Sequence, residues 1–204
     1  MRVPAFIVAL ALAPICSGAG AATYTLDFTG SGAVPDTFGD NAEADLSYRA
    51  IDATAYGDVA TTGMLSFWGG GYGDLDGGLW GNPNPSHGEI RIEAVDPTET
   101  VSILSFDMGG WSADEVAEWR IFDLSWSLVD SGDGIAPNTG GRLSVTPGAS
   151  AVGGLIFQWG ADAWDVAVDN FTYRVGDTTA VPLPAGAWLL IGGIGAIAAL
   201  RRRA

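Results

Sequence analysis

The feature that most constrains this chain is an apolar residue at every second position of several short segments. Ile90, Ile92 and Ala94 alternate with charged neighbours. The same period of two recurs further along, at Leu104, Phe106 and Met108; at Phe122, Leu124, Trp126 and Leu128; at Leu143 and Val145; and at Leu155, Phe157 and Trp159. Successive side chains of a strand point to opposite faces, so this pattern is typical of half-buried β-strands.

Turn-forming stretches separate these segments and indicate the fold class. We expect turns at 130–134 and 146–148, and a long loop over the glycine-rich stretch 69–85. The spacing from Ser112 to Glu115 is that of a capping box, and it supports one or two helical turns at most. About nine short strands at this spacing predict an all-β fold, an antiparallel β-sandwich.

The last expected strand contains a change of face. Val166 and Val168 occupy even positions, whereas Phe171 and Tyr173 occupy odd ones. The buried parity therefore changes across positions 169 and 170, which predicts a β-bulge there. The alternative is that Phe171 faces outward on a strand that is covered from both sides.

The amino-terminal segment, 1–22, has the three-part form of a secretory signal peptide. Arg2 precedes an apolar stretch, Val3–Ile15, and small residues follow at 17–22. We expect cleavage after Ala21 or Ala22. A lipidated Cys16 is the alternative, but the preceding proline and isoleucine fit a lipoprotein signal poorly.

The carboxyl-terminal segment, 179–204, combines a short motif, an apolar span and a basic end. The 18 residues from Leu183 to Leu200 carry no charge, and as a helix they reach about 27 Å, close to the bilayer core of about 30 Å. The arginines after this span favour its carboxyl end on the cytoplasmic side. The span is either a permanent anchor or a temporary one that is removed.

The segment between these ends, 23–178, is long enough for one domain. All 24 acidic residues lie between positions 23 and 180 against five arginines and no lysine, which leaves a formal charge of −19. Nucleic acid is therefore an unsuitable partner, because binding it requires cations against the phosphates. The single cysteine, Cys16, lies in the signal segment, so packing rather than disulfides must hold the domain.

We expect no enzymatic activity. His87 is the single histidine of the chain and lies in a turn-like stretch, with no nucleophile elbow in the sequence. One histidine and one cysteine also disfavour zinc chemistry. Acidic pairs suited to glycoside hydrolysis remain an open alternative, since the sequence contains many carboxylates.

Two tryptophans are candidates for carbohydrate binding. Trp80 and Trp111 lie among glycines, where we expect loops, and exposed aromatic rings can stack on sugar faces. The alternative for each is a place in the core, which is where we expect Trp126 and Trp159.

The carboxyl-terminal segment resembles the VPLPA variant of the PEP-CTERM sorting signals. The motif is Val181, Pro182, Leu183, Pro184 and Ala185, and the basic end is Arg201, Arg202 and Arg203. The resemblance implies an exported protein of a Gram-negative-type bacterium that an exosortase processes. The protein would be held in the membrane by the carboxyl-terminal helix and then released to the cell surface or extracellular matrix.

A second resemblance concerns the two ends of the domain. The segments Thr25–Phe28 and Val166–Phe171 resemble the first and last strands of galactose-binding-like jelly-roll modules. This resemblance implies that the two strands lie side by side and that acidic groups there hold a structural Ca²⁺. Asp169 matches the final-strand acid, with Asn170 beside it, and Asp27 stands near the first-strand position, where relatives often carry a displaced glutamate.

The sequence thus predicts an exported, exosortase-processed β-sandwich with a structural or adhesive role and weak affinity for extracellular polysaccharide. Two alternatives remain, a matrix component without a specific ligand and a polysaccharide-acting enzyme.

Overall fold

The structure is a computed structural model that describes residues 21–176. The predicted signal peptide up to residue 20 and the predicted sorting signal, with its motif at 181–185 and its arginines at 201–203, lie outside the described residues. Within 21–176 there is no helix long and apolar enough to cross a membrane.

The described part of the chain consists of β-strands joined by turns and loops, and its strands pair antiparallel, so the predicted all-β sandwich is confirmed. The strands are β1 (Ala22–Leu26), β2 (Gly32–Ala33), β3 (Ala44–Ile51), β4 (Thr61–Trp68), β5 (Gly78–Asn82), β6 (His87–Ala94), β7 (Thr100–Gly110), β8 (Glu115–Asp123), β9 (Leu128–Ala136), β10 (Leu143–Val145), β11 (Ser150–Val152), β12 (Gly154–Gly160) and β13 (Val166–Val175). The short helix expected after Ser112 does not form, because β8 begins at Glu115.

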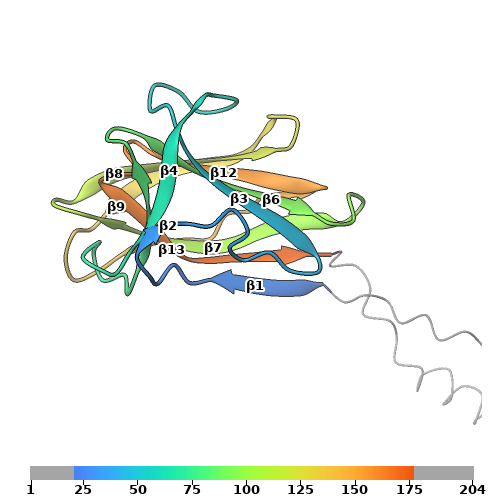
Figure 1. Ribbon diagram of the computed structural model, residues 1–204, viewed down its shortest axis with the longest axis horizontal. Helices are drawn as coiled ribbons and strands as arrows, with labels where there is room; N and C mark the ends of the chain where they lie inside the picture. Colours follow the sequence, from blue (N-terminus) through green and yellow to red (C-terminus); the bar gives the residue numbers. More distant parts are fainter. Residues whose placement is uncertain (1–20, 177–204) are drawn as a thin grey trace, which may run out of the picture. The chain divides into compact units, whose positions relative to one another are not determined.

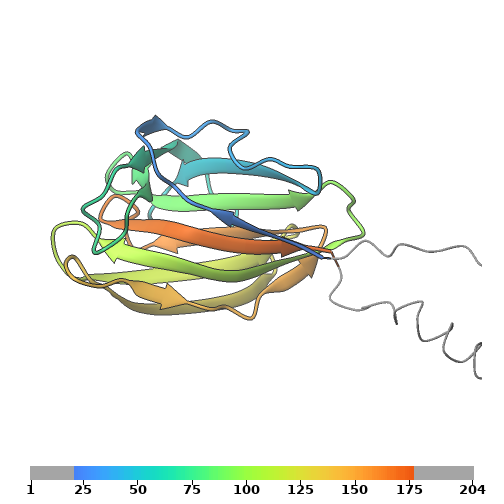
Figure 2. The same cartoon turned by 90° about the horizontal axis from the view of Figure 1, so that it is seen from below.

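The strands form two layers that share β4 (Figures 1 and 2). Sheet A contains β1, β2, β5, β7, β10, β11 and β13, and sheet B contains β3, β6, β8, β9 and β12. The first residues of β4 pair with β3, and residues 64–68 pair with β5. The strand therefore passes from one sheet to the other and joins them at one edge.

Aromatic side chains from both sheets fill the space between the layers. Phe157 of β12 lies 4.6 Å from Phe106 of β7 and 5.2 Å from Phe171 of β13, measured between ring centroids. All three are fully buried, as is Trp159. Burying one such side chain contributes roughly 1.5–3 kcal/mol, so the inward residues of β7, β12 and β13 make a large contribution to stability.

The predicted bulge in the last strand is confirmed. The register of β13 against β7 shifts between Asp169 and Thr172, and Asn170 adopts a left-handed backbone with φ of 50°. Val168 and Phe171 are both buried in the core, so the outward alternative for Phe171 is wrong. The parity of β7 changes as well, and Ile103 rather than the expected Leu104 joins the core.

The first and last strands lie side by side, as the jelly-roll resemblance implied. Ala22 is paired with Val175 and Leu26 with Phe171 (Figure 2). The ten residues of β13 span about 30 Å at roughly 3.3 Å per residue. The start of β13, near Val166, is thus a full strand length from the end where residues 21 and 176 lie.

Two sequence-based expectations about turns are wrong. Residues 130–134 lie inside β9, and part of the glycine-rich stretch 69–85 forms β5. Conversely, the segment around Trp126 is a turn between β8 and β9 rather than a strand. Trp126 has φ of 66° and is half-buried against Phe122, outside the core.

Candidate ligand-binding site

The loop between β4 and β5, residues 69–77, folds back over the outer face of sheet A. Tyr72 and Leu75 of this loop are buried against Ala167 of β13 and Trp80 of β5. This contact requires a residue without a side chain on the strand beneath, because a Cβ at Gly109 of β7 would collide with the Tyr72 carbonyl oxygen. Glycine at this position therefore lets the loop backbone lie directly on the sheet.

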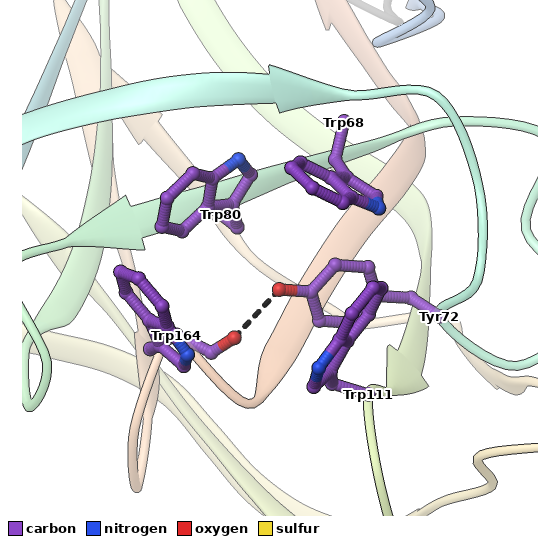
Figure 3. A pocket seen from close by; sticks show the side chains of 5 residues that line it. All are labelled: Trp68, Tyr72, Trp80, Trp111 and Trp164. Atoms are coloured by element: carbon purple, nitrogen blue, oxygen red, sulfur yellow. Dashed lines mark hydrogen bonds between the residues drawn. The ribbon is translucent and has the colours of Figure 1, made fainter.

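Five aromatic side chains surround a cavity of about 170 Å³ beside this loop (Figure 3). We call it the aromatic cavity, and its lining residues are Trp68, Tyr72, Trp80, Trp111 and Trp164. They come from the end of β4, the 69–77 loop, β5, the residue after β7 and the residues before β13. The site thus lies near the start of β13, at the end of the sandwich opposite residues 21 and 176.

Neighbouring rings of the aromatic cavity are mostly perpendicular. Trp68 makes angles of 87° with Trp80 and 89° with Trp111, at centroid distances of 6.0 and 5.3 Å. Trp80 meets Trp164 at 89° and 4.6 Å, and Tyr72 meets Trp111 at 45° and 5.0 Å. Edge-to-face contacts of this kind stabilise aromatic pairs, so the rings hold one another in place around the cavity.

The polar atoms of the aromatic cavity are few. The Tyr72 hydroxyl donates a hydrogen bond of 2.6 Å to the Trp164 carbonyl oxygen (Figure 3). Burial raises the pKa of this hydroxyl, which therefore stays neutral. The indole N–H of Trp80 is buried and has no hydrogen-bond partner among residues 21–176, so one donor on this wall is left for a ligand.

A second, wider cavity of about 570 Å³ adjoins the first. We call it the glycine-rich cavity, and its lining residues are Gly30, Ser31, Gly32, Ser66, Phe67, Trp68, Gly69, Gly70 and Trp80. Trp68 and Trp80 line both cavities. They therefore form a wall between a space lined by aromatic side chains and one that also offers serine hydroxyls and glycine backbone groups.

Carboxylates lie close to the aromatic cavity, although no charged residue lines either cavity. Asp162 and Asp165 lie on either side of Trp164 in the chain, and the backbone N–H of Trp111 donates to the backbone carbonyl oxygen of Asp165 at 2.9 Å. Burial, and then the charge of Asp162, raise the pKa of the Asp165 carboxyl. The surroundings of the site are thus electronegative.

The predicted carbohydrate residues, Trp80 and Trp111, both line the aromatic cavity, although Trp80 lies on β5 rather than in a loop. Sequence reasoning missed Trp68, Tyr72 and Trp164. A usable signal was that Trp68 directly precedes three consecutive glycines. Of the tryptophans expected in the core, Trp159 is fully buried.

The predicted calcium residues lie near the bulge of β13. Asp169 is buried and accepts a hydrogen bond of 3.0 Å from the Phe28 N–H, whereas Asp27 is exposed. The side-chain amide of Asn170 donates to Asp107 at 3.0 Å. No group of three or more His, Cys, Asp or Glu suited to a metal ion occurs among residues 21–176, and calcium binding stays a prediction.

Burial is the main cause that raises the pKa of Asp169, and the charges of Asp27 and Asp107 raise it further. Hydrogen bonds from the Phe28 and Asn170 backbone oppose this rise. Asp169 is therefore a buried acid that holds its proton more tightly than a free aspartate.

His87 lies apart from both cavities. It begins β6 rather than occupying a turn, and it is buried with its ring stacked on Tyr56 at 4.2 Å. Its Nδ1 lies 3.2 Å from the Ala55 carbonyl oxygen. Burial lowers the pKa of His87, so the ring is neutral and enclosed near neutral pH.

No protein-family model and no curated protein matches the chain. Among solved structures it is similar to a family 29 carbohydrate-binding module from Piromyces equi, with 10% identity, a TM-score of 0.38 and coverage of 81% of this chain and 98% of that one. It is also similar to the K3 cleaved adhesin domain of Lys-gingipain from Porphyromonas gingivalis w83, with 13% identity, a TM-score of 0.38 and coverage of 76% and 99%.

A third similar structure is a GH26-CBM35 β-(1,4)-mannanase from Podospora anserina, with 12% identity and a TM-score of 0.36. The match covers 80% of this chain but spans only 29% of the mannanase. Similarity at this level assigns no ligand to the aromatic cavity.

Proposed function

We propose that this protein is an exported surface module that binds carbohydrate across the aromatic and glycine-rich cavities. The observation that carries the proposal is the gathering of five aromatic side chains from separate segments around one cavity. Trp68 and Trp111 are 42% and 38% exposed there. The apolar faces of these two indoles are not buried in the core and are therefore available to a ligand.

Sugar recognition needs both apolar faces and hydrogen-bonding groups, and the two cavities supply them separately. The indole faces of Trp68 and Trp80 can stack on the C–H face of a pyranose ring. Ser31, Ser66 and the glycine backbone of the wider cavity can bond the hydroxyls. At about 570 Å³, that cavity falls in the range of about 300–1,000 Å³ that is usual for small-molecule sites.

We propose binding rather than catalysis at this site. General acid–base and nucleophilic mechanisms need an ionisable or activated side chain at the substrate. The lining hydroxyls are those of Tyr72, Ser31 and Ser66, and the Tyr72 hydroxyl already donates to the Trp164 carbonyl. Neither cavity is lined by an aspartate, glutamate, histidine or cysteine that could activate a serine.

The test is binding of the purified protein to a panel of neutral polysaccharides, measured by affinity electrophoresis and calorimetry. We expect Trp68→Ala and Trp111→Ala to weaken binding about tenfold or more, as is usual for central aromatic contacts. Trp126→Ala is the matched control, since this half-buried tryptophan lines neither cavity. Failure of the wild-type protein to bind any polysaccharide would overturn the proposal.

The cellular setting is part of the proposal. The motif Val181–Ala185, the apolar span and Arg201–Arg203 favour export and exosortase processing, and the pairing of β1 with β13 favours a galactose-binding-like jelly roll. Mass spectrometry of the mature carboxyl terminus from native cells tests the processing step. A terminus close to the motif is expected, and native protein that retains all three arginines would contradict it.

A further inference from the structure

The aromatic cavity differs from a flat sugar-binding platform in how its rings are arranged. A pyranose ring stacks on one exposed face, or between parallel faces. Here Trp68 is perpendicular to both Trp80 and Trp111, and Trp80 is perpendicular to Trp164. Rings at right angles present faces and edges from several directions to one small volume, as Figure 3 shows.

The size of the aromatic cavity restricts what can enter it. Its volume of about 170 Å³ is below the range of about 300–1,000 Å³ for typical small-molecule pockets. A compact group fits this space, whereas the body of an oligosaccharide requires the adjoining glycine-rich cavity.

The lining of the aromatic cavity offers few hydrogen-bonding groups to a ligand, since the buried Trp80 N–H can only donate one bond. The one hydroxyl, that of Tyr72, already donates to the Trp164 carbonyl. A sugar hydroxyl placed among these rings would lose its bonds to water with little replacement, which is costly. A quaternary ammonium group has no N–H to satisfy, and it interacts favourably with aromatic faces within about 6 Å.

The charge of the surroundings favours a cation over an anion. Burial is the main cause that raises the pKa of the Tyr72 hydroxyl, and the nearby charges of Asp165 and Asp162 raise it further. No arginine lines either cavity, and the chain carries a formal charge of −15 with no lysine. Anionic groups are therefore repelled from this end of the sandwich, and cations are attracted.

From ring geometry, size, polarity and charge together, we propose that the aromatic cavity is a cage for a quaternary ammonium group such as that of choline. This proposal rests on the proposed function only in taking the same cavities as the binding site, and it adds the chemical class of the ligand. It assigns the ligand class as a cation-bearing molecule, with the cation among the rings and any attached sugar in the glycine-rich cavity.

The first experiment separates cation recognition from simple apolar filling. The purified protein is titrated with choline chloride and with 3,3-dimethylbutan-1-ol, its neutral isostere, at matched ionic strength, and tryptophan fluorescence is recorded. We expect choline to bind at least about tenfold more tightly, because the two molecules differ in charge rather than shape. Equal affinities, or no binding of choline, would overturn the cage.

The second experiment varies one ring while the fold is kept. Trp111 lies at the open side, so Trp111→Phe and Trp111→Leu should both fold, which thermal unfolding checks. Cation–π binding predicts a loss of about 5- to 30-fold for leucine and a smaller loss for phenylalanine. Trp126→Leu is the matched control and should bind choline like the wild type. Wild-type affinity in Trp111→Leu would count against the cage.

A third set of measurements identifies the source of the cation and keeps the two proposals distinguishable. Binding is compared between a choline-substituted polysaccharide and the same polysaccharide after removal of choline, and between phosphatidylcholine and phosphatidylglycerol vesicles. Preference for the choline-bearing member of either pair supports the cage and identifies its source. If neutral polysaccharides bind but choline does not, the cage is wrong and carbohydrate binding stands. The reverse result would retain the cage alone.

Discussion

Two loops fold across the two outer faces of the sandwich, and they leave very different surfaces. The loop at 52–60 covers sheet B, where the Gly57 N–H donates to Gln158 at 2.7 Å and the Gln158 amide donates back to the Gly57 carbonyl at 2.8 Å. Beneath it, the carboxylate of Glu89 accepts from both Arg49 and Gln158. The loop at 69–77 instead covers sheet A with aromatic contacts and borders an open cavity.

Both loops cover the outer face of a sheet, but they differ in how their side chains are packed and paired. On sheet B the covering aromatic ring, Tyr56, is enclosed between His87 and Arg120, and the polar groups around Gln158 bond to one another. On sheet A, Trp68 and Trp111 stay exposed, at 42% and 38%. We infer that the first loop contributes stability and the second contributes binding.

The largest effect on this comparison is expected from Arg49→Met. Arg49 donates two hydrogen bonds to the buried Glu89 carboxylate, one from Nε to Oε1 and one of 3.0 Å from Nη2 to Oε2. The change removes both. Because Arg49 is 29% exposed and Glu89 only 3%, we expect a loss of about 2–3 kcal/mol in the free energy of unfolding. Chemical denaturation measures this loss, and ligand affinity should be unchanged.

Arg91→Met is the matched control for that prediction. Its partner Glu93 is 48% exposed, and pairs between exposed charges contribute less than about 1 kcal/mol. If the two variants are equally stable, the Glu89 network does not hold the sheet B loop.

The next effect is expected from Gly109→Ala, which tests the sheet A loop. The added methyl group collides with the Tyr72 backbone, so the loop must move. We expect a stability loss of about 1–3 kcal/mol and at least about tenfold weaker ligand binding, measured by denaturation and calorimetry. A Cβ at Gly148 meets nothing within 4 Å, so Gly148→Ala should match the wild type. Unchanged binding in Gly109→Ala would mean that the loop position does not matter to the site.

The smallest effect is expected at Asp169, on the same face as the sheet A loop. The folded state raises the pKa of this carboxyl above 3.8, so the folded protein holds the proton more tightly than the unfolded chain. Stability from this group therefore falls as the pH rises above about 3.8. Asp169→Asn cannot ionise and keeps an oxygen for the Phe28 N–H. We expect it to be more stable than the wild type near pH 7 and similar near pH 3.

Calcium gives the same variant a second use. If Ca²⁺ binds at Asp27, Asp169 and Asn170, the ion will raise the thermal midpoint of the wild type but not of Asp169→Asn. A midpoint that calcium and chelator leave unchanged would remove the calcium prediction, and the pH comparison would still test the buried acid.

The parts of the fold that could be predicted are those where local pattern and burial agree. Ile90 and Ile92 alternate with charged residues, and β6 buries them as expected. The parity change at the bulge could also be predicted, because Val168 and Phe171 are both large and apolar but lie at positions of opposite parity. Such segments need no knowledge of distant contacts.

The parts that could not be predicted depend on distant contacts. Residues 130–134 read as a turn, yet Gly132 and Gly134 belong to β9 because the side chains of Trp119 and Leu143 lie directly over them. Trp126 read as core, yet Asp123 accepts hydrogen bonds from the Ser125 and Ser127 backbone and forms a turn there.

The site was only partly predictable for a similar reason. Trp80 and Trp111 could be singled out by their glycine-rich contexts. The arrangement of Trp68, Tyr72 and Trp164 around them arises from the 69–77 loop and the sheet A register, which no local pattern encodes.

The position of the cavities at one end of β13 and of residues 21 and 176 at the other has a mechanical consequence. A pull between a bound ligand and residue 176 runs lengthwise along β13, which pairs with β1 and β7 on its two sides. The interstrand hydrogen bonds lie across that direction, so they are loaded together in shear rather than opened one after another. We therefore expect this module to resist tension best when it is pulled along that axis.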